Sequence, residues 1–252
     1  MIEIIKSNDE VINFLKQEGF SCHNALNYVA YDKNACVFIY NSDVSNGVII
    51  SNADQDFFYL VTKCRDFLDE FWSTLPIGHG HKLFSGVADD VAEVFLADKT
   101  AAWQSPCKVY AFFGDNFAFE ENLEYAHDVL TANDAEEVDE FYTYRDEDSV
   151  HRLRDAIIES DSSCVRINND LAAWCMVHTE DGSMGPLFTK EAYRRRGLGQ
   201  LVSGRLIKKL LAKGHVPYVH INVENTASLA LAADMAAFTY THDCVWFGVM
   251  KE

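Results

Sequence analysis

The chain has 252 residues, 48% of them hydrophobic and 13% aromatic, which is enough to bury one large core or two small ones. Its formal net charge of −18 repels phosphate backbones and anionic lipids, so we expect no nucleic acid and no membrane among its partners. The seven cysteines lack CxxC spacing, no apolar run could span a membrane, and Met1–Ser7 lacks a signal-peptide core, so we expect an intracellular protein, cytoplasmic or mitochondrial.

The first half of the chain predicts alternating helices and strands. Ser7 and Asn8 can cap a helix whose apolar positions include Val11, Phe14 and Leu15. The patterns that follow predict, in chain order, strands at Cys36–Tyr40, Val48–Ser51 and Phe57–Thr62, a helix around Phe67–Trp72, a strand at Leu83–Val87, a helix at Asp89–Leu96 and a strand at Val109–Phe113.

The second half repeats this order of elements. It predicts a helix at Ser149–Glu159, strands at Cys164–Ile167, Leu171–Val177 and Met184–Phe188, a helix at Leu198–Leu211, a strand at Tyr218–Val223, a helix at Ser228–Met235 and a strand at Cys244–Val249. The acidic stretch Asp115–Asp146 lies between the halves and contains a helix that starts near Asp134. We therefore expect two domains, residues 1–125 and 126–252.

One segment between a predicted strand and a predicted helix carries three arginines and two glycines. Arg194–Arg196 precede Gly197, and Gly199 lies in the first turn of the helix. A helix N-terminus presents unpaired N–H groups and a partial positive charge, and glycines there let an anion approach the backbone closely. The segment therefore predicts a binding loop for a diphosphate.

The helix after this loop has an apolar stripe, and its basic residues fall outside that stripe. The stripe consists of Leu198, Val202, Leu206 and Leu210, whereas the basic residues are Arg205, Lys208, Lys209 and Lys213. Two other phosphate loops do not fit: the Walker pattern GxxxxGK[ST] does not occur, and a dinucleotide fingerprint needs a third small residue where Val202 stands.

Arg194, Gly197 and Gly199 fit the pattern [RQ]xxGx[GA], which resembles motif A of the GNAT N-acetyltransferase superfamily. The segment Val223–Leu229 resembles its second signature, in which an asparagine, here Asn225, opens a helix. Within the superfamily, the chain resembles most the glycine N-acyltransferase-like group. The matching residues are Ser163, Cys164 and Trp174 before the loop, and Gly214, Pro217, Tyr218, His220, Glu224 and Asn225 after it.

This resemblance implies an α/β (α+β) GNAT fold, a mixed, mostly antiparallel sheet flanked by helices, in two GNAT-like halves. It implies transfer of an acyl group from acetyl-CoA or a longer acyl-CoA to a primary amine, such as the amino acid glycine, with no metal. The diphosphate would bind the loop amides, pantetheine would run beside the preceding strand, and a strand amide would stabilise the oxyanion. The residues implied for coenzyme A are Leu187, Phe188, Thr189, Arg194, Arg195, Arg196, Gly197, Leu198, Gly199, Gln200, Asn225 and Ser228.

The acceptor amine must lose a proton, which requires a base. We expect it among His220, Glu224 and Glu180, with His178 and Asp181 as further candidates. His220 shares a strand face with Tyr218, Asn222 and Glu224, although a hydrogen-bonded structural histidine is an alternative interpretation. Glu180 and Asp181 precede a glycine and also fit a solvated hairpin turn.

The chain departs from the family pattern at three places. Ala232 stands where many GNAT enzymes have a tyrosine that protonates the leaving thiolate, so that proton donor is absent or comes from elsewhere, for example Tyr240. Ala237-Phe238 replaces the usual Gly-Phe, and Ser183 stands near the position of a proposed glutamate base. A catalytically silent acyl-CoA-binding protein and a protein or peptide N-acetyltransferase therefore remain as alternatives.

Three other features carry weaker signals. His79-Gly80-His81 lacks a third metal ligand at a matching spacing, so we expect an exposed loop. Cys164 and Cys175 lie in apolar strands and fit a core better than a nucleophile. In the first half, the strand Phe57–Thr62 runs into Lys63–Leu68 without a glycine, so we expect no coenzyme A loop there.

Overall fold

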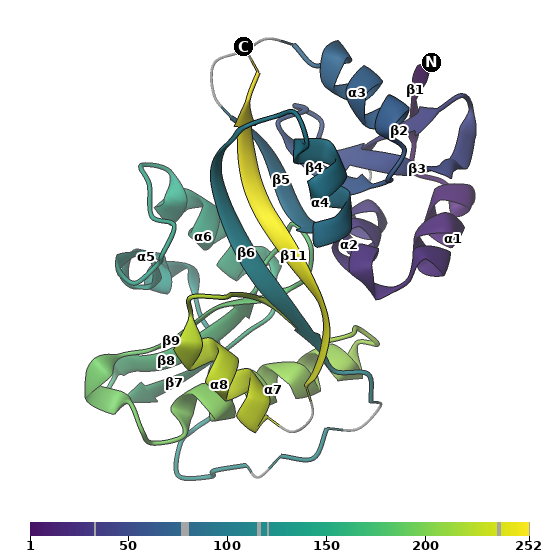
Figure 1. The fold of residues 1–252 in the computed structure, drawn as a ribbon. Coiled ribbons are helices and arrows are strands. Elements are labelled where there is room, and N and C mark those ends of the chain that lie inside the picture. The colour runs from purple at the N-terminus through teal and green to yellow at the C-terminus, as the bar shows by residue number, and fades with distance from the viewer. Residues whose placement is uncertain (33, 77–80, 115–116, 120, 236–237, 252) are drawn as a thin grey trace. The chain divides into compact units, whose positions relative to one another are not determined.

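The computed structural model in Figure 1 describes the chain except residues 33, 77–80, 115–116, 120, 236–237 and 252. In chain order, its elements are β1 (Ile2–Lys6), α1 (Asp9–Glu18), η1 (Phe20–Cys22), α2 (His23–Tyr31), β2 (Cys36–Tyr40), β3 (Asp43–Ser51), β4 (Phe57–Val61), α3 (Arg65–Thr74), β5 (His81–Ala88), α4 (Asp89–Leu96), β6 (Ala101–Ala111), η2 (Ala132–Asp134), α5 (Ala135–Glu140), α6 (Ser149–Glu159), β7 (Ser162–Ile167), β8 (Asp170–Val177), β9 (Met184–Thr189), η3 (Glu191–Tyr193), α7 (Leu198–Ala212), β10 (Tyr218–Asn222), α8 (Thr226–Asp234) and β11 (Thr239–Met250).

The chain forms two compact units. The first contains residues 1–109, 220–224 and 240–252, and the second contains residues 110–219 and 225–239. These units are not the two sequence halves, because the end of β10 and nearly all of β11 belong to the first unit.

An eight-stranded sheet with the order β1-β2-β3-β4-β5-β11-β6-β10 organises the first unit. The first four strands pair antiparallel, β4 and β5 pair in parallel, and β5 and β11 pair antiparallel. The last strand of the chain, yellow in Figure 1, therefore lies between β5 and β6. Strands of the two sequence halves thus alternate at this end of the sheet.

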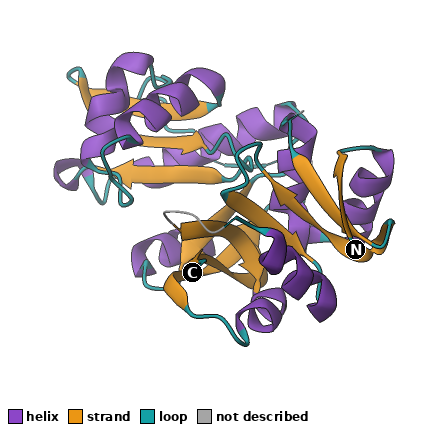
Figure 2. Ribbon diagram, turned by 90° about the horizontal axis from the view of Figure 1, so that it is seen from above, coloured by secondary structure: helices purple, strands orange, loops and turns teal. Residues whose placement is uncertain are grey.

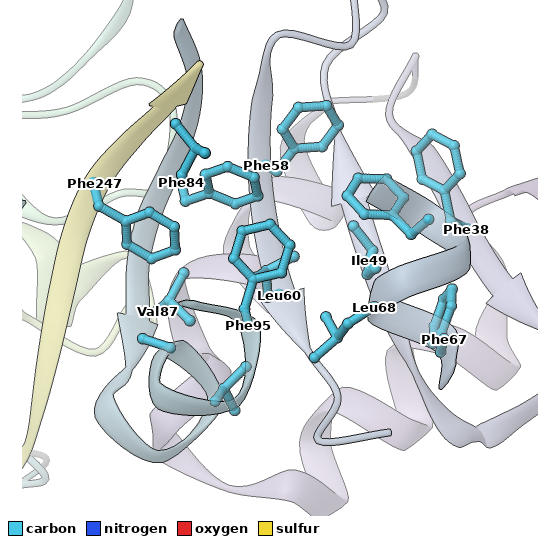
Figure 3. Close-up of a cluster of buried hydrophobic side chains, with 14 of the residues drawn as sticks. Phe38, Ile49, Phe58, Leu60, Phe67, Leu68, Phe84, Val87, Phe95 and Phe247 are labelled. Carbon is cyan, nitrogen blue, oxygen red and sulfur yellow. The ribbon is translucent and has the colours of Figure 1, made fainter. Parts of the chain in front are cut away.

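The strands of the first unit bury both of their faces. In β2, Phe38 joins a core beneath α3 and α4, whereas its neighbours Val37 and Ile39 join a second core with α1 and α2. This follows from the two-residue period of a strand, which sends successive side chains to opposite faces. Figure 3 shows the first of these cores, in which Phe84 stacks on Phe247 with ring centroids 4.7 Å apart.

The second unit has a three-stranded antiparallel sheet, β7-β8-β9, with helices on both faces (Figure 2). Along β8, Trp174 and Met176 pack in the cluster with α5 and α6, whereas Cys175 and Val177 pack in the cluster with α7. Within the described part of the sheet, β9 pairs with β8 only and is an edge strand.

Most expected elements are confirmed, with two omissions. Asn8 caps α1 by accepting a hydrogen bond from the backbone N–H of Val11 at 3.0 Å, and the bounds of β2, α4 and α6 are as expected. The expected strand at Val109–Phe113 begins earlier, as β6 at Ala101. We did not expect β1 or α2.

The place of Arg205 outside the apolar stripe implied that its side chain lies on the surface of α7. In the structure, the side chain is buried instead. Its side chain is 4% exposed and donates hydrogen bonds to Glu121 Oε1 at 2.6 Å and to the carbonyl oxygens of Tyr125 and Ala126 at 2.6 and 3.0 Å. The five N–H donors of a guanidinium suit such a cluster of acceptors. Arg205 therefore attaches the connecting segment 121–126 to α7.

Replacing this buried cation should destabilise the protein. We expect Arg205→Met to lower the free energy of unfolding by about 2–4 kcal/mol, because it leaves a partly buried carboxylate and two carbonyls without their donor. Denaturant titration followed by circular dichroism measures the change. Lys213→Met is the matched control, since Lys213 pairs with Asp161 in an exposed ion pair and should cost less than about 1 kcal/mol. Equal losses in the two variants would contradict the anchoring role of Arg205.

Candidate coenzyme A site

The segment between β9 and α7 has an unusual backbone. Arg194 is extended, with φ −63° and ψ 161°, and Arg195 follows with a φ of +61°. Gly197, the N-cap of α7, has a φ of +73°. A left-handed conformation costs a non-glycine residue about 1 kcal/mol or more, so other contacts must hold Arg195 in place.

A hollow of about 210 Å³ lies at this helix start. It is lined by Thr189, Arg194, Arg195, Gly197, Leu198, Gly199, Gln200 and Leu231. A Cβ atom at Gly199 would lie 3.6 Å from Thr189 Oγ1 and 3.7 Å from Leu231 Cδ2, so a larger side chain there enters the hollow without an immediate clash. The glycine thus keeps the hollow open beside the first-turn amides of α7.

The three arginines of the loop carry uncompensated charge. In the described part of the chain, no carboxylate lies within ion-pair distance of Arg194, Arg195 or Arg196, although the formal net charge is −18. Arg194 Nε donates to Thr189 O at 3.2 Å, and Arg196 donates to Ala192 O at 3.4 Å. Arg194 also lies over the ring of Phe188 and Arg196 over that of Tyr193, with 5.8 and 5.5 Å from guanidinium carbon to ring centroid. Neither a carbonyl nor a ring neutralises a guanidinium, so these groups favour an anion nearby.

Neighbouring polar groups, in contrast, are bound to one another. Lys190 Nζ donates to Asp170 Oδ1 at 2.5 Å and also to Glu137, and Tyr193 Oη donates to Asp170 Oδ2 at 2.8 Å. These hydrogen bonds, first the one from Lys190, hold the pKa of Asp170 below its usual value. This group was not predicted from the sequence, where its signal is an acidic residue directly after the turn Asn168-Asn169.

The structure gathers some of the expected coenzyme A residues and not others. The hollow includes Thr189, Arg194, Arg195 and the run Gly197–Gln200, whereas Leu231 was not expected there. Five expected residues do not line it, namely Leu187, Phe188, Arg196, Asn225 and Ser228. Phe188 stacks on Phe141, with the ring centroids 4.7 Å apart. Asn225 caps α8, because its side-chain oxygen accepts a hydrogen bond from the backbone N–H of Ser228 at 3.1 Å.

The ring orientation of His220 is set by a neighbour in the first unit. Its Nδ1 accepts a hydrogen bond from Trp246 Nε1 at 3.1 Å. Gly86, with a φ of +50°, leaves room for this ring, because a Cβ there would lie 2.7 Å from His220 Cε1. An indole N–H can only donate, so a neutral His220 carries its proton on Nε2.

The acidic candidates occupy turns. Glu180 is exposed in the hairpin between β8 and β9, and Glu224 is exposed just after β10. In the same hairpin, the buried Asp181 accepts from the backbone N–H of Ser183 at 2.9 Å, and His178 N–H donates to Ser183 O at 2.8 Å. The expected hairpin turn is therefore present, and Glu180 is exposed in it, but the expectation of a solvated side chain is wrong for Asp181, which is 1% exposed.

Burial opposes a nucleophilic role for the two strand cysteines. It raises the pKa of both Cys164 and Cys175 to about 12, so neither side chain is a thiolate at neutral pH. Across the described residues, no group of three or more metal-ligating side chains occurs. His79 and Gly80 of the His-Gly-His segment lie outside these residues.

None of the described helices is both long enough and apolar enough to cross a membrane.

The corresponding place in the first half, between β4 and α3, is neutralised by its own side chains. Arg65 Nε donates to Asp69 Oδ2 at 2.7 Å, and Nη1 donates to Val94 O at 3.0 Å. Nη2 forms an ion pair with Asp98. Lys99 binds the same two aspartates. The first turn of α3 also carries Asp66.

Comparison with known proteins supports the fold. The model of the family described as FR47-like protein matches residues 164–246. No curated protein matches the chain in sequence.

Solved structures match over nearly the whole length. A Drosophila protein is 16% identical, with 98% of each chain covered and a TM-score of 0.78. A GNAT-family acetyltransferase from Colwellia psychrerythraea is 14% identical, with 99% of each chain covered and a TM-score of 0.59. A tandem GNAT protein from the clavulanic acid biosynthesis pathway is 10% identical, covering 99% of this chain and 98% of its own, with a TM-score of 0.54.

At these identities, the likeness establishes the fold alone. The expected fold is confirmed: the chain has a mixed α/β architecture with a large, mostly antiparallel sheet flanked by helices, and it consists of two GNAT-like halves.

Proposed function

We propose that the protein is an N-acyltransferase that binds acetyl-CoA or a longer acyl-CoA at the start of α7 and transfers the acyl group to a small-molecule amine. One observation carries the proposal: no described carboxylate forms an ion pair with Arg194, Arg195 or Arg196, and the first two line a hollow with Gly197 and Gly199 in an acidic chain. The FR47-like match and the GNAT fold support the same activity.

The hollow suits the diphosphate of coenzyme A. Amides of Arg195 to Gln200 would bind its oxygens, and Gly199 lets the phosphates approach the backbone. The unpaired edge of β9, as far as the sheet is described, offers backbone groups to pantetheine. An amide at this edge would then donate to the oxyanion of the tetrahedral intermediate.

The chemistry requires two proton movements. The amine nitrogen attacks the thioester carbonyl carbon and loses a proton to a base, and the C–S bond then breaks as the coenzyme A sulfur gains a proton. The candidates for the base remain His220, Glu224 and Glu180. His220 can accept a proton at Nδ1 only if Trp246 releases it, whereas the two glutamates are exposed.

For the acceptor, we propose a chemical class, a small-molecule amine, and not one compound. The resemblance to the glycine N-acyltransferase-like group favours an amino acid such as glycine. A catalytically silent acyl-CoA-binding protein is the second candidate, because the bound Nδ1 of His220 and the alanine at position 232 leave the proton transfers without an evident group. Thiol release from acyl-CoAs with a panel of amino acids, polyamines and peptides separates the two.

We further propose that residues 1–125 form a GNAT-like domain without a coenzyme A site and residues 126–252 form the acyltransferase domain. The ion pairs of Arg65 with Asp69 and Asp98 support this division, because they place carboxylates where an anion would have to bind. The free thiols of all seven cysteines fit an intracellular, reducing compartment.

Coenzyme A should stabilise the protein at a single site. At a hundredfold excess over the dissociation constant, we expect about 2.7 kcal/mol of stabilisation by mass action, seen as a higher melting temperature. Isothermal titration with acetyl-CoA should give one site per chain, and Arg65→Ala should leave the affinity unchanged. The absence of a thermal shift with millimolar coenzyme A, acetyl-CoA or longer acyl-CoAs would refute the proposed function. Two binding sites per chain would refute the proposal that the first half lacks a coenzyme A site.

Filling the hollow should abolish coenzyme A binding. In Gly199→Val, the new Cβ lies at ordinary contact distances from Thr189 and Leu231, so we expect the fold to persist while the methyl groups exclude the phosphates. We expect at least a hundredfold loss of affinity in a titration with coenzyme A. Ala212→Val, which introduces the same β-branched side chain in the exposed last turn of α7, should bind normally. Normal binding by Gly199→Val would mean that the loop is only a helix cap.

Removal of the base should affect turnover more than binding. In His220→Gln, the amide oxygen can still accept from Trp246, so the packing is kept while proton transfer is lost. We expect this variant or Glu224→Gln to lower kcat by about a hundredfold, within the usual range for general bases, with an unchanged affinity for coenzyme A. If both variants turn over normally, the role passes to Glu180 or to water.

A further inference from the structure

We propose that Asp170 is the positioning residue of the coenzyme A loop and thereby sets the affinity for acyl-CoA. This rests on the proposed function, because it concerns the same loop. Asp170 does not line the hollow, and it acts through Lys190 and Tyr193.

The local sequence delivers this carboxylate to one place. Asn168 and Asn169 have φ values of +54° and +68°, the left-handed pair that a tight two-residue hairpin requires and that asparagine tolerates best after glycine. The turn joins β7 to β8, and Asp170 is the first residue of β8, paired with Ile167. A tight hairpin leaves Asp170 little freedom to move, so it can serve as an anchor.

The two carboxylate oxygens hold the two ends of η3. Oδ1 binds Lys190, the residue before η3, at 2.5 Å, and Oδ2 binds Tyr193, its last residue, at 2.8 Å. Backbone bonds connect the same points, from Lys190 N–H to Ala172 O at 3.0 Å and from Tyr193 N–H to Lys190 O at 2.9 Å. The turn that precedes the arginines is thus tied at both ends to β8.

This attachment has two consequences for the loop. It fixes the direction in which Arg194 leaves η3 and thereby supports the left-handed conformation of Arg195, which lines the hollow. It also satisfies the carboxylates of Asp170 and Glu137 with Lys190 and Tyr193, so these acids do not pair with the arginines. Both effects favour an anion without any direct contact from Asp170.

Asp170→Asn tests the proposal, because asparagine keeps the size of the side chain but loses the charge and the second acceptor oxygen. We expect its dissociation constant for coenzyme A in isothermal titration, and its KM for acetyl-CoA, to rise about tenfold, while kcat at saturating acetyl-CoA stays within twofold. Tyr193→Phe should weaken binding less. The double variant should be no weaker than Asp170→Asn, since both changes break the same hydrogen bond.

Asp146→Asn is the matched control. Asp146 also binds a cation, Arg152, and backbone N–H groups, and its pKa is also lowered, first of all by the bond from Arg152, but it lies outside the loop. It should lower the melting temperature by a similar amount and leave coenzyme A affinity unchanged.

Three outcomes would overturn the proposal: unchanged affinity in Asp170→Asn, an equal loss of affinity in Asp146→Asn, or additive losses in the double variant. Failure of the wild-type protein to bind coenzyme A would instead refute the proposed function itself.

Discussion

The candidate site depends on keeping cationic groups unpaired in a strongly acidic chain. With a formal net charge of −18, the chain offers many carboxylates with which an exposed arginine could form an ion pair. Near α7, three acids are bound by other cations: Asp170 and Glu137 by Lys190, and Glu121 by Arg205. A guanidinium that is already paired gains little from a phosphate, so this distribution of partners decides where an anion can bind.

Local sequence signals predicted the loop but not its supports. A strand, a glycine-containing turn and an amphipathic helix are read from neighbouring residues, which is why β9 and α7 lie where expected. The partners of Arg205 are 79 to 84 residues away, and a helical projection cannot reveal that a distant segment covers a polar position. The role of Asp170 depends in the same way on the pairing of β8 with β9.

The two elements that were not predicted from the sequence, β1 and α2, have weak local patterns. The strand β1 is a mostly exposed edge strand, paired with β2 alone, so its residues lack a clear apolar alternation. The helix α2 has no side-chain cap at Cys22, and its packing with α1 and β4 compensates. The place of β11 between β5 and β6 is likewise a tertiary property, because the apolar pattern of a strand does not name its neighbours.

The same topological position has opposite electrostatics in the two halves. Both place basic residues where a strand gives way to a helix, at Arg65 after β4 and at Arg194–Arg196 after β9. After β4, no glycine opens the turn, and Asp69 and Asp98 neutralise the arginine. After β9, Gly197 and Gly199 line the hollow at the start of α7, and Asp170 is held by Lys190. A few side chains therefore decide whether such a junction of strand and helix forms an internal salt-bridge network or leaves its arginines without a described carboxylate partner.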